Sequence, residues 1–226
     1  MEVFLLKKLQ LKDPASALTH ILGSATALLT SIPLLIRLAN SSDYLHTISI
    51  AIFSFGLVLL YTASSLYHSI NSTETVNRRL KKFDHMSIFV LIAGTYTPIC
   101  LIVLGGRSGL TLFFVIWVMA LAGMCLKAFW VYCPRWVSSV IYIAMGWMCI
   151  FTFPQLVNKL SGAAFLWLLA GGIIYTIGGV IYALKLPLFN SLHKNFNSHD
   201  IFHLFCLGGS FCHFVLMYFY VAKMPV

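Results

Sequence analysis

The stretch AAFLWLLAGGIIYTIGGVIYAL, residues 163–184, decides the fold class of this chain, because none of its 22 residues is charged. An α-helix rises about 1.5 Å per residue, so about 20 apolar residues cross a hydrocarbon core about 30 Å thick. This stretch therefore predicts a membrane-spanning helix rather than a buried helix of a soluble protein.

Six further stretches share this character. Of the 226 residues, 60% are hydrophobic and 9% are charged, whereas a soluble domain carries about 25% charged residues. We expect an all-α, polytopic integral membrane protein that forms one seven-helix domain over residues 1–226. The predicted membrane spans are 17–37, 46–68, 84–104, 110–130, 137–157, 163–184 and 200–222.

The distribution of positive charge predicts the orientation. With the amino terminus inside, the cytoplasmic segments hold eleven of the fifteen lysines and arginines; the other side keeps Arg37, Arg107, Lys159 and Lys223. Because positive loops are retained in the cytoplasm, we expect a cytoplasmic amino terminus and an external carboxyl terminus. Residues 1–12 predict a tail rather than a removable signal peptide. The short termini favour a bacterial inner membrane.

The net charge of +9 raises the alternative of nucleic-acid binding. The basic residues are spread over loops, and no basic patch is interleaved with aromatic residues on a soluble face. We therefore expect membrane lipids as partners and no nucleic acid.

Five polar residues at predicted helix ends are the candidate functional residues, because ionisable side chains are costly inside a bilayer. Ser64 and His68 share one face at the end of the second span, Asp84 opens the third, and His199 and His203 open the seventh at positions i and i+4. The chain direction brings all five to the cytoplasmic side. Three imidazoles beside a carboxylate match a catalytic zinc site, in which water fills the fourth position, and imidazole ligands favour zinc over magnesium or calcium.

Other features of the seventh span are weaker candidates. The sequence HDIFH, residues 199–203, is similar to the zincin pattern H-E-x-x-H, but aspartate reaches less far than glutamate and no further ligand follows at zincin spacing. Asp200 is explained by its position at a helix amino terminus. His213 lies about 15 Å further along the helix, so we expect a packed or hydrogen-bonded histidine.

Two interpretations of the first span stay open. Asp13, Ser16 and His20 could orient a ligand histidine from outside the ligand set, or could cap the helix at the interface. The remaining histidines are expected at solvent or interface positions: His46, His85 and His193. The six cysteines form no C-x-x-C pair, and they predict small buried hydrophobes rather than a disulfide framework or a thiolate site.

Three motifs in order resemble the hemolysin III family, the bacterial branch of the progestin and adipoQ receptor family, over nearly the whole chain. They are SSLYH at 64–68, FDH at 83–85 leading to AGTYTP at 93–98, and HDIFH at 199–203 leading to GGS at 208–210 and HF at 213–214. The resemblance implies a seven-helix bundle with zinc held by His68, His199 and His203. It also implies that Asp84 approaches the ion through water.

The wider superfamily includes alkaline ceramidases, and their similar residue set implies a zinc-dependent hydrolase of membrane lipid amides. In that interpretation Asp84 is the general base and Ser64 donates a hydrogen bond to the developing oxyanion. The family usually shows Glu and Asn in the first helix where this chain has Asp13 and Ser16. That departure concerns the residues around the ligands rather than the ligands themselves.

Two non-enzymatic alternatives remain. The zinc could be a structural staple in a sensor or regulator of membrane state. The family name also raises a cytolysin, although uniformly apolar helices show no amphipathic stripe that would line a pore.

Overall fold

The computed structural model describes residues 11–40, 44–184 and 198–224. Within these ranges, seven helical segments are long and apolar enough to cross a membrane. The prediction of an all-α integral membrane protein with seven spans is therefore confirmed. The predictions for the tail and for His193 concern residues outside the described part.

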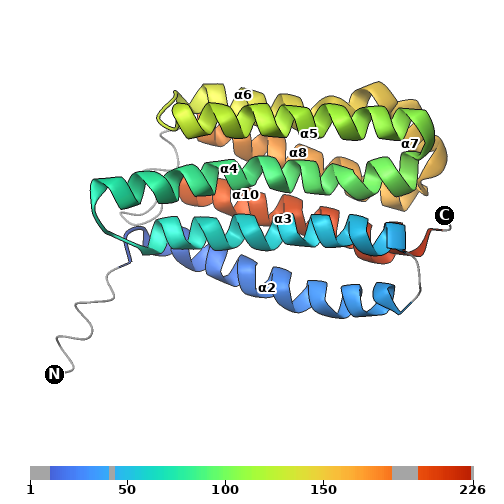
Figure 1. Cartoon of the computed structure of the whole chain (residues 1–226), viewed down its shortest axis with the longest axis horizontal. Helices are drawn as coiled ribbons and strands as arrows, with labels where there is room; N and C mark the ends of the chain where they lie inside the picture. The colour runs from blue at the N-terminus through green and yellow to red at the C-terminus, as the bar shows by residue number, and fades with distance from the viewer. Residues whose placement is uncertain (1–10, 41–43, 185–197, 225–226) are drawn as a thin grey trace.

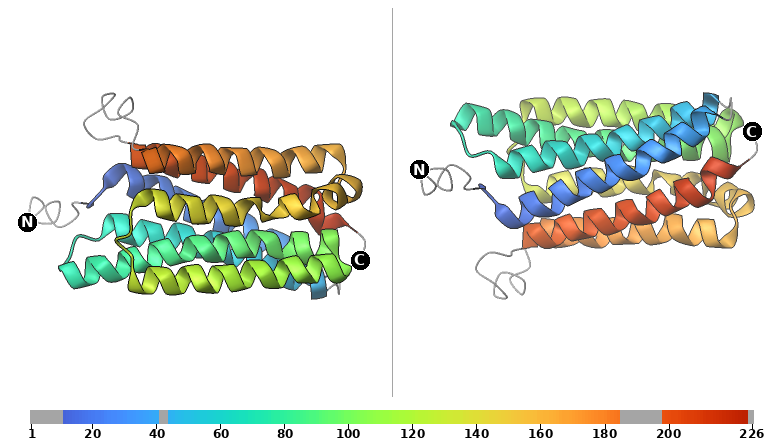
Figure 2. Two further views of the ribbon diagram at one scale, coloured as in Figure 1. Left: turned by 90° about the horizontal axis from the view of Figure 1, so that it is seen from above. Right: turned by 90° about the horizontal axis from the view of Figure 1, so that it is seen from below.

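The helices lie alongside one another in an elongated bundle (Figure 1). They are α2 (Pro14–Ala39), α3 (Tyr44–Ser69), α4 (Glu74–Pro98), α5 (Gly106–Phe129), α6 (Arg135–Gly146), α7 (Phe153–Lys159), α8 (Gly162–Leu184) and α10 (Ser198–Phe219). Helix α3 packs between α2 and α4, and α8 packs on α10, which in turn contacts α2 (Figure 2). The starts of α2, α4, α6 and α10 and the ends of α3 and α5 share one end of the bundle.

The third span begins earlier than the sequence pattern predicted. Helix α4 starts at Glu74, so the expectation that Asp84 opens this helix is wrong: Asp84 lies about three turns inside it. The Thr73 side chain accepts a hydrogen bond from the Val76 N–H, and the Glu74 carboxylate favours the positive end of the helix dipole. The first turns are charged, and an apolar window therefore misses them.

Proline interrupts the regular winding of α4. Pro98 has no N–H to donate, and the chain continues from it as a π-helical segment, Ile99–Leu104. The span then ends at Gly105 and Gly106, whose φ angles of 57° and 54° lie in the left-handed region that glycine tolerates. These two glycines form the turn between the third and the fourth span.

The fifth span is also broken. Helix α6 ends at Gly146, and a 3-10 segment, Trp147–Thr152, leads into α7. At the break the Tyr96 hydroxyl donates to the Gly146 carbonyl at 2.6 Å and accepts from the Cys149 N–H at 2.9 Å. A side chain of α4 thus satisfies backbone groups that the break releases, as a membrane interior requires.

Small residues let α3 and α4 approach closely. A Cβ atom at Gly94 would lie 3.0 Å from the Ile52 carbonyl oxygen, and one at Gly56 would lie 3.1 Å from the Leu91 Cα. Close backbone approach through small residues is a common basis of helix packing in membranes. The pairing fixes the end of α3, which carries His68, against the first half of α4, which carries Asp84.

Candidate metal centre

Three histidines gather at the end of the bundle where α3 ends and α10 begins. One ring nitrogen from each of His68, His199 and His203 lies within 4.8 Å of the others. The Nε2 atoms of His68 and His199 are 3.2 Å apart. His199 and His203 are one helical turn apart on α10, so the helix itself presents both rings to His68. We call these three residues the histidine centre.

Asp13 fixes the orientation of His68. Its carboxylate lies 2.9 Å from His68 Nδ1, and because a carboxylate only accepts, Nδ1 donates and the Nε2 lone pair faces His199. The backbone N–H of Asp13 also donates to the His68 carbonyl at 2.9 Å. Asp13 makes no side-chain cap on α2. The geometry therefore favours the ligand-orienting interpretation of Asp13 over the capping interpretation.

Residues of α2 also surround His203. The Thr19 hydroxyl donates to the Ser16 carbonyl at 2.9 Å, and its oxygen lies 3.5 Å from His203 Nδ1. The His20 ring stacks on the His203 ring with centroids 3.7 Å apart. These contacts leave Nε2 as the nitrogen through which His203 would bind a cation.

Asp200 ties α10 to α2. Its side chain is 3% exposed and accepts a hydrogen bond of 2.5 Å from the Ser16 hydroxyl. The expectation that Asp200 serves only the helix dipole missed this contact.

Lys12 precedes α2, and its ammonium lies over the Tyr67 ring. Burial lowers the pKa of Lys12, although the charges of Asp13 and Asp84 oppose the shift.

The donor set fits zinc. Two imidazole nitrogens that each bind zinc at 2.0–2.1 Å with a tetrahedral angle are about 3.3 Å apart, and the His68 and His199 nitrogens are 3.2 Å apart. All three side chains offer imidazole, which zinc accepts more readily than magnesium or calcium does. The partner of His68 on its other nitrogen is a carboxylate, a recurrent arrangement around zinc-bound histidines.

A cavity of about 140 Å³ opens beside the histidine centre. His199 and His203 line it together with Ser64 of α3 and Asp84 of α4. Asp84 is 7% exposed and lies close enough to Ser64 to share a hydrogen bond with it. Asp84 lines this cavity but does not belong to the compact group of three histidines.

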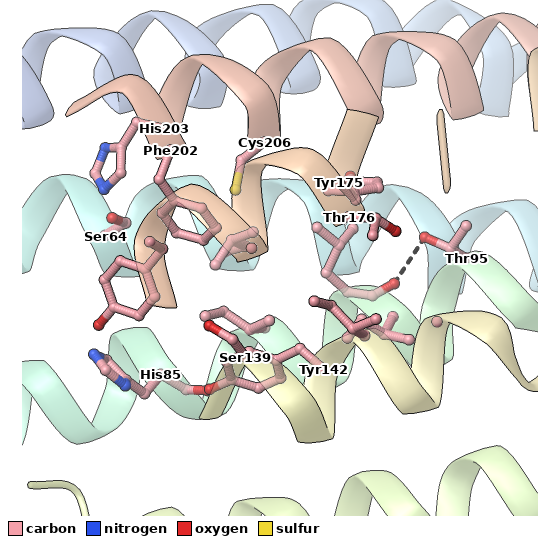
Figure 3. A pocket seen from close by; sticks show the side chains of 18 of the residues that line it. Ser64, His85, Thr95, Ser139, Tyr142, Tyr175, Thr176, Phe202, His203 and Cys206 are labelled. Carbon is pink, nitrogen blue, oxygen red and sulfur yellow. Dashed lines mark hydrogen bonds between the residues drawn. The ribbon is translucent and has the colours of Figure 1, made fainter. Parts of the chain in front are cut away.

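The cavity extends away from the histidine centre between α4, α6, α8 and α10. Figure 3 shows His203, Ser64 and His85 at one end and Tyr175, Thr176 and Thr95 at the other. A second cavity of about 50 Å³ shares Thr95 and His213 with the first and continues among apolar side chains. The site thus combines a polar end with a long apolar extension into the bundle.

Two histidines lie elsewhere than expected. His85 lines the cavity, and His46 is 1% exposed at the start of α3, so the prediction of solvent or interface positions is wrong for both. Tyr142 donates to the His85 carbonyl and covers this part of α4 from α6. His213 donates through Nε2 to the Leu168 carbonyl at 3.2 Å, which confirms the prediction of a packed, hydrogen-bonded histidine.

A hydroxyl network below the histidine centre was not predicted. The Tyr61 and Tyr175 hydroxyls each lie 2.6 Å from Ser210 Oγ, which joins α3, α8 and α10. A Cβ at Gly209 would come within 2.7 Å of the Tyr175 ring, so only glycine leaves room for it. The GGS motif at 208–210 was the sequence signal for this junction, but a motif alone does not name the tyrosines that meet there.

The chain is similar to known proteins over most of its length. The sequence profile described as "Haemolysin-III related" matches residues 10–214. The chain is 38% identical to the hemolysin-3 homolog of Bacillus subtilis (strain 168) over 95% of this chain and 96% of that protein, and 37% identical to hemolysin-3 of Bacillus cereus over 93% and 92%. It is also 28% identical to the human monocyte to macrophage differentiation factor, over 82% of this chain and 75% of the relative.

Proposed function

Because this chain belongs to the haemolysin-III related family, we propose that it is a zinc-dependent hydrolase that cleaves the amide bond of membrane lipids. The observation that carries the proposal is the cavity beside the histidine centre. Catalytic zinc sites have three protein ligands and keep one position for water or substrate. Here His199 and His203 of the histidine centre line a cavity that Asp84 and Ser64 also line.

The residues divide the chemistry among them. When bound, zinc supplies a Lewis acid that polarises a carbonyl and lowers the pKa of water towards about 7. Asp84 accepts the proton of the water that attacks the amide carbon, and the Ser64 hydroxyl turns from Asp84 to donate a hydrogen bond to the carbonyl oxygen as it gains charge. The C–N bond then breaks, and the proton held by Asp84 passes to the leaving amine nitrogen. Asp13 and Thr19 hold the ligand rings from behind.

The apolar extension supports a lipid substrate. Pocket walls from α4, α6, α8 and α10 leave room for a hydrocarbon chain beyond the polar end. An amide at the histidine centre with its acyl chain along the cavity would place apolar atoms against apolar walls, which is the favourable arrangement.

The orientation in the membrane belongs to the same proposal. The histidine centre and the start of α2 share one end of the bundle. With the amino terminus in the cytoplasm, the site faces the inner leaflet of a bacterial plasma membrane. A reporter that is active only outside the cytoplasm should be active when fused to the carboxyl terminus and inactive when fused to the amino terminus.

Enzyme assays on the purified protein test the hydrolase. Wild-type protein in lipid nanodiscs is assayed for fatty acid released from ceramide and from phospholipids, and bound zinc is measured on the same samples. Asp84→Asn should lower turnover about 10²–10⁴-fold while zinc is retained. Ser64→Ala should lower it about 10²-fold. Ser65→Ala is the matched control, because Ser65 donates within its own helix to the Tyr61 carbonyl.

One specific observation favours a second candidate. The histidine centre joins α3 to α10, two helices that the chain separates by four other spans. A structural zinc would tie them together in a non-enzymatic sensor or regulator of membrane state. Wild-type protein with full zinc and no turnover on the lipid panel, together with unfolding of His203→Ala, would support the staple over the hydrolase.

The names of two relatives concern hemolysins. A hydrolase that changes lipid composition accounts for lysis without a pore. Lysis that persists in the Asp84→Asn variant would instead support direct membrane damage.

A further inference from the structure

A second polar cluster lies at the same end of the bundle, outside the cavity and its histidines. Lys127, in the last turn of α5, is 0% exposed. Its ammonium donates to Cys133 Sγ at 3.0 Å and to Ser138 Oγ at 2.5 Å, and Ser138 Oγ lies 3.3 Å from the same sulfur. We call these three residues the lysine cluster.

Lys127 is a buried cation that lacks a carboxylate partner among the described residues. Among the described residues it is the only buried lysine or arginine, and no carboxylate there forms an ion pair with it. A buried cation without a counter-charge is strongly unfavourable. The carbonyl end of α5 provides about half an elementary charge at most. The Cys133 thiol is the group in the cluster that can ionise to supply the remainder.

The hydrogen bonds of the lysine cluster are directed at the Cys133 sulfur. The Lys127 ammonium can only donate, so the sulfur accepts from it. Ser138 Oγ also accepts from Lys127, and its own hydrogen is directed at the sulfur when the sulfur carries no proton. Two donors therefore converge on Sγ, as a thiolate requires. Cys133 also precedes the start of α6, where the helix dipole favours an anion.

The surrounding titratable groups act in the same direction or weakly against it. Hydrogen bonds from Ser138 and Lys127 and the charge of Lys81 on α4 lower the pKa of Cys133, although burial alone would raise it. Tyr142 on α6 and Tyr182 on α8 are the other titratable side chains that interact with the thiol. None of these groups is an acid that would displace the thiolate from Lys127.

From this geometry we infer that Cys133 is a thiolate held by Lys127 and is a site of modification by small hydroperoxides. Cys133 is 8% exposed, next to Tyr132, which is 59% exposed, so a small oxidant or a small trapping reagent can reach the sulfur. The sulfur lone pair attacks one peroxide oxygen, an S–O bond forms, and the O–O bond breaks. Sulfur loses two electrons and becomes a sulfenic acid, and the other peroxide oxygen leaves as hydroxide, or as an alkoxide from an organic hydroperoxide, and takes a proton from the buffer.

The pH dependence of alkylation tests the thiolate. The full-length protein in nanodiscs is treated with iodoacetamide from pH 5 to 10, and the rate at each cysteine is measured by peptide mass spectrometry. The midpoint for Cys133 should lie below the ordinary thiol value of 9.0. Lys127→Met should raise the midpoint by about one unit or more. A wild-type midpoint near the ordinary value, or one that Lys127→Met leaves unchanged, would overturn the inference.

Peroxide treatment tests the modification without relying on the variant. Wild-type protein is exposed to hydrogen peroxide with dimedone, which traps sulfenic acids. The adduct should form at Cys133 at least about ten-fold faster than at Cys125, which is exposed on α5 and has no ammonium beside it in the described structure. Equal labelling of the two cysteines, or no adduct at Cys133, would contradict the inference. Cys133→Ser provides the background.

Discussion

The histidine centre and the lysine cluster lie at the same end of the bundle but meet opposite electrostatic problems. The histidine centre brings together three bases whose nitrogens face one another. The lysine cluster buries one cation and places a thiol against it. In our proposals, a cation from outside the chain completes the first arrangement, whereas the chain itself neutralises the second. The two sites show that a group of buried polar side chains can favour binding of an ion from solution or can balance its charge with a neighbouring side chain.

The largest effect is expected when a residue of the histidine centre is replaced. His203→Ala removes one of the three proposed ligands, so zinc affinity should fall by more than about 10²-fold, the upper range for losing a residue that only supports a ligand. Zinc per chain is measured by elemental analysis after dialysis. His213→Gln is the control, because His213 donates to a carbonyl rather than belonging to the centre. Full zinc in the alanine variant would remove His203 from the site.

The next largest effect is expected when Cys133 of the lysine cluster is replaced. Cys133→Ala leaves Lys127 buried without its counter-charge and should destabilise the folded protein by about 3 kcal/mol. The double variant Lys127→Met with Cys133→Ala should recover most of that loss. Unfolding in detergent at a series of denaturant concentrations measures both. A double variant as unstable as the single one would show that Lys127 does not depend on Cys133.

The pH dependence of this pair has a definite sign. The pKa of Cys133 is lowered in the folded protein from its ordinary value of 9.0 by Ser138 and Lys127, which together outweigh burial. The stabilisation is therefore fully present above pH 9 and is lost as the pH falls through the lowered value. The double-mutant coupling between Lys127 and Cys133 should decrease in that direction. Zinc loss from the histidine centre should not follow it.

A smaller effect sharpens the role of the residues behind the ligands. Asp13→Ala removes the acceptor for His68 Nδ1, so zinc affinity should fall about 10–100-fold. Isothermal titration with a competing chelator measures the change. Ser16→Ala, which loses only the contact to Asp200, should have a smaller effect. An Asp13→Ala protein with wild-type affinity would show that the tautomer of His68 is fixed by another group.

The smallest effect is expected from a substitution at Tyr96, which lies away from both clusters. Tyr96→Phe leaves the Gly146 carbonyl and Cys149 N–H without the tyrosine hydroxyl, which should cost about 1–2 kcal/mol. Thermal unfolding measures it, and Tyr44→Phe is the exposed control. Zinc content and the alkylation profile of Cys133 should stay unchanged. A change in either would show that the helix break is coupled to that cluster.

The sequence predicted the spans well because hydropathy reports what faces lipid. It placed six of the seven spans to within a few residues, and it failed at the start of α4, where charged turns continue the helix beyond the apolar window. It brought His68, His199 and His203 to one end from chain direction alone. That step needs only the odd and even order of the helices.

Side-chain partners could not be predicted in the same way. Asp13 was left between two roles, because helix position does not reveal that its carboxylate reaches His68. His85 was assigned to the interface from its angle around α4, but Tyr142 of α6 covers that face. Cys133 was expected to be a buried hydrophobe like the other cysteines, and only the packing of α5 against α6 brings Lys127 to it. These facts depend on contacts between spans, which periodicity does not encode.

The separation of the ligands along the chain also sets an order of assembly during synthesis. His68 and His199 are 131 residues apart, and α10 is the last of the seven described spans to be synthesised. A nascent chain that ends before α10 has only one of the three imidazoles in place. In the proposed zinc site, metal acquisition would therefore be a late step of biogenesis, after α10 has entered the bilayer and closed against α2 and α8.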